Sequence, residues 1–260
     1  MATTTWVAAW RLAVGSLTVV PVRPPGEITP PVAGRAMAIG PLVALLVSVP
    51  SAAGGQLALW FGVPAAGAGL IVVGLLALLT RGMHTDGLAD TADGLASSWE
   101  VARALAVMRT GDLGPAGAVT LIVVLGLQAV VAGELLTRPL GWLIVSLAFA
   151  AGRAALALGT LRGVPAARAD GLGAAVAGSV SPAVAGASWL LVIAALTGVA
   201  LVVQLPWWGG GVALASGLAV ASLLLARCRR RLGGITGDVL GALVEVASVV
   251  VLVVVQGLGR

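Results

Sequence analysis

The chain has 260 residues, of which 59% are hydrophobic and only 10% are charged, and its mean hydropathy is +1.09. A soluble domain of this length carries about 25% charged residues, so the composition excludes a soluble globular protein. All 15 basic residues are Arg, and the net charge of +5 fits the basic loops of a membrane protein, so no nucleic-acid partner is expected.

The first predicted element is an amphipathic stretch near the N-terminus. Large apolar residues recur three or four positions apart, which is helical spacing: Trp6, Trp10, Val14 and Leu17. We predict a short helix that lies on the membrane surface and is ended by the proline-rich residues 21–31. Residues 1–35 then form a cytoplasmic N-terminal interfacial segment.

Seven apolar runs follow, each long enough to cross a bilayer. A helix needs about 17–25 residues to cross the hydrocarbon core, whereas a transmembrane barrel would show short alternating segments. The predicted spans are residues 37–60, 63–80, 117–136, 140–160, 184–205, 209–226 and 239–258. The sequence therefore predicts one all-α, polytopic helical membrane domain over residues 1–260, with about seven transmembrane helices.

The arginines are distributed very unequally between the two sides of these spans. With a cytoplasmic N-terminus, twelve fall in inside segments and two in outside segments, while Arg153 lies within a span. Because positive residues accumulate in cytoplasmic loops, this orientation is the predicted one. Most acids lie in the same inside loops, so residues 81–116, 161–183 and 227–238 are expected to form an active site on the cytoplasmic face.

The loop after the second span carries three Asp residues in helical register. Asp86, Asp90 and Asp93 follow the pattern i, i+4, i+7, which places them within about 60° on one helix face. Like charges on adjacent turns repel, so such a stripe is favoured where a cation neutralises it. Carboxylates select Mg²⁺ or Mn²⁺, and the single Cys228 excludes a cysteine-based metal site. We predict Mg²⁺ ligation by these three residues; the alternative is a solvated helix face.

His84, the only His in the chain, lies two residues before Asp86. On a helix it points about 160° away from that residue, so we do not expect it among the metal ligands. It is a candidate catalytic base or phosphate contact, and a polar residue at the membrane interface is the alternative.

Three further patches combine Arg or Thr with acids and Gly at the ends of predicted spans. They supply candidate substrate or phosphate ligands: Arg109 and Asp112, Arg168 and Asp170, and Thr236 and Asp238. Backbone N–H groups in Gly-rich turns bind phosphate, and Arg pairs with it. Each patch alone is also what an ordinary inter-span loop contains. Together with the Asp stripe, they predict an interfacial Mg²⁺ and phosphate site.

Two ionisable residues lie deeper, within predicted spans. Arg153 is about two turns inside its span, and Glu245 follows Asp238 by seven residues on the same helical face. A charged group at that depth is costly in lipid, so each is expected to face the protein interior and to contribute to the substrate site.

Several of these motifs together resemble the adenosylcobinamide-GDP ribazoletransferase family, also called cobalamin synthases. The matching segments are HTDGLADTADG at 84–94, VPAARADGLG at 164–173 and GGITGDVLGALVE at 233–245. The likeness runs from about residue 30 to 250. It departs at Thr110, which follows Arg109 where the family pattern has an Asp; the nearest acid here is Asp112.

The resemblance implies a Mg²⁺-dependent phosphotransferase that transfers α-ribazole, or its 5′-phosphate, to adenosylcobinamide-GDP and releases GMP. It implies that Mg²⁺ on the Asp stripe neutralises the diphosphate, that Arg109 and Arg168 hold phosphate oxygens, and that His84 or one Asp accepts the attacking proton. It further implies a multi-pass protein of the prokaryotic plasma membrane, with other cobalamin-assembly enzymes as candidate partners and the oligomeric state open.

Two alternatives remain. DTADGLA, at 90–96, matches the first half of the CDP-alcohol phosphotransferase pattern, but Ser97 and Ser98 replace its Ala-Arg pair and no later pair of Asp four apart follows. A small-molecule transporter is the alternative from another class. Against it, the acids gather on one face of the membrane and no inverted repeat is visible.

Overall fold

The computed structural model describes residues 2 to 259, and over these residues the chain is helical without a β-strand. In chain order the helices are α1 (Ala2–Leu17), α2 (Pro30–Ala38), α3 (Gly40–Trp60), α4 (Ala65–Leu79), α5 (Met83–Ser97), α6 (Val101–Val107), α7 (Pro115–Leu136), α8 (Gly141–Gly152), α9 (Ala154–Gly159), α10 (Gly171–Val176), α11 (Pro182–Val202), α12 (Gly209–Leu232) and α13 (Gly237–Gly257). The predicted all-α class is confirmed.

Six stretches of the described chain are long and apolar enough to cross a membrane: α3, α7, α8 joined to α9, α11, α12 and α13. α4 and α5 pass the same test only as a pair, and they are bent by 92° at the break between them. The molecule is therefore a multi-pass membrane protein with six spans, or seven if the bent pair counts as one. The predicted span 63–80 corresponds to α4, which begins at Ala65 and has only 15 residues.

The bend between α4 and α5 is made by the residues that join them. Arg81 and Gly82 have positive φ values of 57° and 67°. The N–H of Gly82 donates to the carbonyl oxygen of Ala77 at 2.7 Å, which closes α4 in the manner of a Schellman motif. As a result the axis of α5 is nearly perpendicular to that of α4, and the acids of α5 do not lie on a continuation of α4.

The predicted surface helix is present as α1, but one of its faces packs into the protein. That face is buried against α2 and α3, while Trp6 and Trp10 remain 50% and 39% exposed. The Arg81 guanidinium donates to the carbonyl oxygens of Gly15 and Thr18 at 2.7 and 2.9 Å. Positive charge thus meets the negative end of the α1 dipole, and α1 is fastened to the α4–α5 junction.

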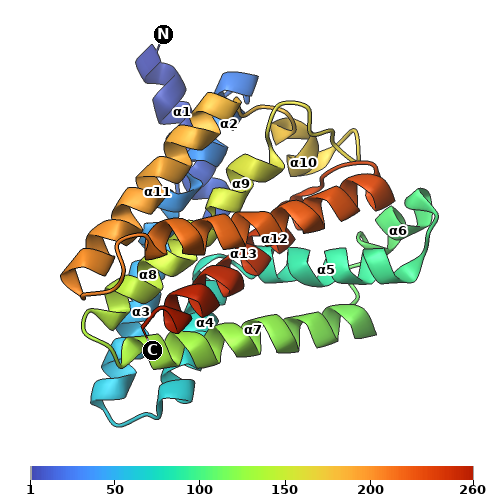
Figure 1. Cartoon of the computed structure of the whole chain (residues 1–260). Coiled ribbons are helices and arrows are strands. Elements are labelled where there is room, and N and C mark those ends of the chain that lie inside the picture. Colours follow the sequence, from blue (N-terminus) through green and yellow to red (C-terminus); the bar gives the residue numbers. More distant parts are fainter. Residues whose placement is uncertain (1, 260) are drawn as a thin grey trace.

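The polar connections gather at one end of the bundle. Figure 1 shows α6, α10 and the C-terminal end of α12 on one side, whereas the turns 61–64, 137–140 and 203–208 lie toward the other. Among the spans, α13 is deeply buried and packs against α5, α7, α8 and α12. Its N-terminal end therefore emerges from the centre of the bundle beside the polar loops.

Candidate active site

The candidate site is built where the first half of α5 crosses the start of α13. The two backbones meet at glycines. A Cβ atom on Gly87 would lie 2.7 Å from the carbonyl oxygen of Asp238, and one on Gly241 would lie 3.1 Å from the Cα atom of His84. Residues without a side chain permit this close approach, which sets the acids of α5 beside Asp238.

Four carboxylates from the two helices interact electrostatically: Asp86, Asp90 and Asp93 of α5 and Asp238 of α13. Partial burial, followed by the charges of the other acids with Asp86 first, raises the pKa of Asp90 to about 6. Arg168 acts in the opposite direction. Within residues 2 to 259, no three His, Cys, Asp or Glu side chains are already arranged as a metal centre. The cluster therefore has an excess of negative charge without preformed ligand geometry.

Asp93, predicted as the third metal ligand, has a different environment. Its carboxylate oxygens accept hydrogen bonds from the N–H groups of Gly114 and Gly117, both at 2.8 Å, at the start of α7. A Cβ atom on either glycine would overlap this carboxylate, so both positions require glycine for the contact. The negative charge also meets the positive end of the α7 dipole. Asp93 thus links α7 to α5. Its carboxylate is engaged by backbone N–H groups, whereas the spacing predicted an open stripe of three carboxylates.

Replacing Asp93 with Ala is expected to lower the free energy of unfolding by about 1–2 kcal/mol, because two backbone N–H groups lose a charged acceptor. Hydrogen exchange in detergent should accelerate in peptides that contain Gly114 and Gly117, and the thermal midpoint should fall. Glu27→Ala, at an exposed acid between α1 and α2, is the matched control and should change neither quantity. Unaltered exchange in Asp93→Ala would contradict the capping role.

The segment before α10 is attached to the residues that precede α13. The N–H of Ala167 donates to the carbonyl oxygen of Ile235 at 2.8 Å, and the N–H of Ile235 donates to that of Pro165 at 2.9 Å. A Cβ atom on Gly234 would overlap the Pro165 backbone, so this pairing again depends on a glycine. Two loops far apart in sequence are thereby held side by side.

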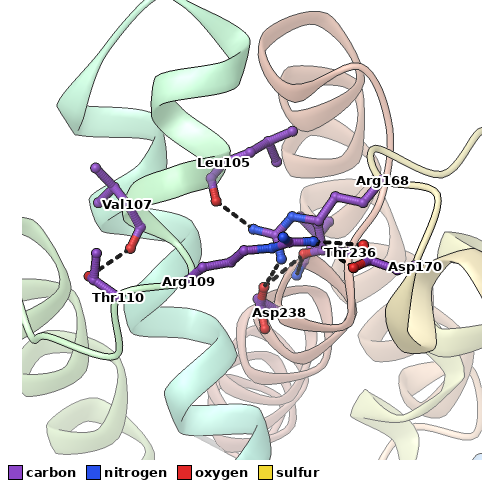
Figure 2. A network of polar contacts seen from close by, with 9 residues as sticks. Leu105, Val107, Arg109, Thr110, Arg168, Asp170, Thr236 and Asp238 are labelled. Atoms are coloured by element: carbon purple, nitrogen blue, oxygen red, sulfur yellow. Dashed lines mark hydrogen bonds and ion pairs between the residues drawn. The ribbon is translucent and has the colours of Figure 1, made fainter.

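Arg168 joins three elements of the site, as Figure 2 shows. Its guanidinium donates to the carbonyl oxygen of Leu105, in α6, at 2.7 Å and lies 3.9 Å from the carboxylate of Asp238. The Thr236 hydroxyl donates to the same carboxylate at 3.1 Å and accepts from the N–H of Val239 at 3.2 Å, so it caps α13. Arg168, Thr236 and Asp238 are brought together as the sequence predicts.

Arg109 and Asp170 form an exposed ion pair at the outer edge of the site (Figure 2). One guanidinium nitrogen lies 2.6 and 2.9 Å from the two carboxylate oxygens, and the side chains are 54% and 70% exposed. An ion pair this exposed adds little to stability. The Arg109 side chain can therefore exchange its partner for another anion at small cost.

A cavity of about 280 Å³ lies beside these residues. Its polar lining consists of predicted site residues: His84, Asp86, Arg168, Asp170, Thr236 and Asp238. His84 is 3% exposed, and neither ring nitrogen has a hydrogen-bond partner within the described chain. Burial, followed by the charge of Arg153, lowers the pKa of His84 to about 3, so the ring is neutral.

Arg153 and Glu245 lie in a second buried polar cluster and do not line this cavity. The Gln128 side-chain amide donates to a carboxylate oxygen of Glu245 at 2.7 Å, and Arg153 donates to the carbonyl oxygen of Phe149 at 3.0 Å. The three polar side chains line a separate cavity of about 10 Å³, close to the room that one water needs. Arg153 and Glu245 therefore do not lie at the cavity where the sequence analysis expected them to contact substrate. The sequence analysis did not single out Gln128, although a lone polar residue in an apolar run is a signal of such a buried polar contact.

Asp112 also lies apart from the cavity. It is exposed in the loop between α6 and α7, and its backbone N–H is directed to the Thr110 hydroxyl at 3.5 Å. Arg231, which the sequence analysis counted only among the inside arginines, makes specific contacts in the structure. It donates to the carbonyl oxygen of Ser98 at 2.7 Å and stacks 3.7 Å over the Trp99 ring, which closes the C-terminal end of α5.

Comparison with known proteins gives consistent matches over nearly the whole chain. Residues 9–256 match the family described as cobalamin-5-phosphate synthase. An adenosylcobinamide-GDP ribazoletransferase of Nocardioides sp. is 44% identical over 243 residues, which cover 92% of this chain and 94% of that protein. Proteins of the same name from Frankia casuarinae and Pseudomonas entomophila are 37% and 36% identical and cover 94% and 93% of this chain and 92% and 96% of their own. No solved structure matches.

Proposed function

The chain belongs to the cobalamin-5-phosphate synthase family, and we propose that it transfers α-ribazole, or its 5′-phosphate, to adenosylcobinamide-GDP with release of GMP. One observation carries the proposal. The motif residues at 84–94 and 233–245, which lie far apart in sequence but within the matched region, meet at the α5–α13 crossing around one cavity. The relatives of that name match over almost their whole length.

In the proposed reaction, a ribazole hydroxyl oxygen bonds to the phosphorus attached to cobinamide. The bond from that phosphorus to the bridging oxygen breaks, and GMP leaves with this oxygen. The hydroxyl proton passes to a base, for which His84 and Asp86 are candidates because both line the cavity. Negative charge grows on the leaving phosphate, so the site must present cations to it.

We propose Asp86, Asp90 and Asp238 as the residues that hold Mg²⁺. They fit this cation because three carboxylates from two helices face only partial compensation by Arg168, and carboxylate oxygens are the ligands that Mg²⁺ prefers. When bound, Mg²⁺ would neutralise the diphosphate and the departing GMP. Asp93 is left out of this set because both of its oxygens are engaged by α7.

We propose that Arg168 and Arg109 hold phosphate oxygens. Arg168 lines the cavity next to Asp238, and Arg109 lies at the edge of the site in its exposed pair with Asp170. A phosphate group can replace the Asp170 carboxylate as the partner of Arg109, because both present oxygens to a guanidinium in the same way.

We further propose that the protein resides in the plasma membrane of a prokaryote with this site on the cytoplasmic face. Twelve of the arginines fall in the segments that the predicted orientation places inside, which include the site loops 81–116, 161–183 and 227–238. The helices α6 and α10 and the C-terminal end of α12 lie at one end of the bundle (Figure 1). The accumulation of positive charge in cytoplasmic loops supports this orientation.

Nucleotide release by the purified protein tests the proposal. With adenosylcobinamide-GDP, α-ribazole and Mg²⁺, GMP should appear in step with the corrinoid product. CMP release from a CDP-alcohol instead would indicate a CDP-alcohol phosphotransferase. Solute uptake by proteoliposomes without any nucleotide release would indicate a transporter.

Chelation of divalent cations is expected to stop this reaction. Treatment with EDTA should lower GMP release by at least about 100-fold, and added Mg²⁺ should restore it, since the acid cluster would otherwise repel the diphosphate. The rate of GMP release before and after chelation is the measurement. Undiminished release in EDTA would overturn the metal assignment while leaving the transferase activity in place.

A further inference from the structure

The lining of the cavity at the α5–α13 crossing contains two chemically different sets of side chains. The polar set consists of the acids, Arg, Thr and His described above. The apolar set, called the apolar wall below, comes from six helices: Leu17 of α1, Met37 of α2, Met83 of α5, Leu156 of α9, Leu172 of α10 and Leu240 of α13. Four of these side chains are at most 4% exposed, and Met83 and Leu172 are partly exposed. A site that binds only phosphate needs polar and charged groups, so these apolar side chains indicate that the ligand also has an apolar part.

The volume of the cavity limits what it can hold. Pockets for drug-sized ligands measure about 300–1,000 Å³, and this cavity of about 280 Å³ lies just below that range. A nucleoside, with one heterocyclic base and one ribose, is of a suitable size. A corrinoid is a macrocycle with many side chains and is far too large to enter.

We infer that this cavity is the subsite for the acceptor nucleoside, with its heterocyclic base against the apolar wall and its ribose toward His84 and Asp86. This inference rests on the proposed function and deepens it. The corrinoid donor stays outside and presents only its diphosphate at the polar edge, near Arg168 and Arg109. The attacking hydroxyl and the diphosphate then meet at the acids between the two subsites.

The state of His84 supports this placement. Its ring is 3% exposed, it lines the cavity, and both nitrogens lack a hydrogen-bond partner within residues 2 to 259. Buried polar groups in native proteins are nearly always paired. A ribose hydroxyl can donate and accept hydrogen bonds, and a ring nitrogen of the bound nucleoside can accept one, so either group supplies a partner for a His84 nitrogen.

The test narrows the cavity at Leu172, a partly exposed residue of the apolar wall, with Leu172→Trp. Leu191→Trp, in α11 at a side chain that is 73% exposed, adds the same side chain at a residue that does not line this cavity and is the matched control. For Leu172→Trp we expect the KM for α-ribazole to rise at least tenfold, while the KM for adenosylcobinamide-GDP stays within twofold. Equilibrium dialysis of α-ribazole alone should show the same loss of affinity. The control should behave as the unmodified protein.

A second variant, Leu156→Ala, removes part of the same wall and should also weaken α-ribazole binding, by about tenfold. A rise in the KM for the donor instead, or unchanged α-ribazole binding in both variants, would overturn the assignment of the subsite. The unmodified protein separates this failure from a failure of the proposed function. If it releases no GMP, the function itself is wrong, whereas GMP release without a Leu172→Trp effect rejects only the subsite.

Discussion

Replacing Asp86 or Asp90 with Asn is expected to lower GMP release by about a thousandfold or more, while the protein still inserts and folds. Both carboxylates belong to the cluster proposed to hold Mg²⁺, and loss of a metal that stabilises transition-state charge removes several kcal/mol. Neither side chain caps a helix in the way that Asp93 does. The measurements are kcat for GMP release and the thermal midpoint in detergent.

Glu27→Gln is the control for this loss of charge, because Glu27 is an exposed acid between α1 and α2. Its activity should lie within about twofold of the unmodified protein, as is usual for surface substitutions. Full turnover in both Asp86→Asn and Asp90→Asn would contradict the role of the acids. Loss of turnover accompanied by loss of the folded protein would also contradict it, because the residues would then be structural.

Replacing Gly87 with Ala is expected to lower kcat by about 100-fold and the free energy of unfolding by about 1–3 kcal/mol. The added Cβ would lie 2.7 Å from the carbonyl oxygen and 2.8 Å from the Cα atom of Asp238. Since backbone atoms cannot rotate away, α5 must move from α13, and the two groups of acids separate. GMP release and urea or thermal unfolding measure the two effects.

Gly74→Ala is the matched control, since Gly74 lies in α4 and a Cβ there meets nothing within 4 Å. It should leave kcat unchanged and stabilise the protein slightly, because Ala favours a helix more than Gly does. A Gly87→Ala protein with normal kcat would show that the close crossing does not control the site. Equal losses in both variants would point to a general cost of substituting helical glycines.

The class of the protein could be predicted from the sequence because it depends on properties read locally. Apolar runs of sufficient length predicted the spans, and six helices of the described chain meet that criterion, with α4 and α5 as a bent seventh. The prediction could not detect the 92° bend, because the apolar run of 63–80 and the acids of α5 are consistent with a continuous helix. The bend depends on the left-handed backbone of Arg81 and Gly82.

The candidate site could be predicted in part. Charged and Gly-rich segments pointed to His84, Asp86, Arg168, Asp170, Thr236 and Asp238, and these line one cavity. The same reasoning also named Asp112, Arg153 and Glu245, which do not line this cavity. A charged residue in a loop or deep in a span looks the same in sequence whether its side chain contacts substrate, solvent or another buried side chain. Gln128 and its hydrogen bond to Glu245 became visible only through packing.

The sequence by itself determined that the protein is a helical membrane protein and which segments hold its charged and Gly-rich motifs, since hydropathy and helical period are set by neighbouring residues. Only the tertiary structure decided which acids lie close to one another. Helical spacing placed Asp93 on one helix face with Asp86 and Asp90. In the structure the Asp93 carboxylate accepts hydrogen bonds from the N–H groups of Gly114 and Gly117, because α7 packs against α5. Asp238 lies close enough to Asp90 to interact with it electrostatically, because α13 also packs against α5. Spacing within one helix fixes the direction of a side chain, whereas its partner depends on which other helix lies in that direction.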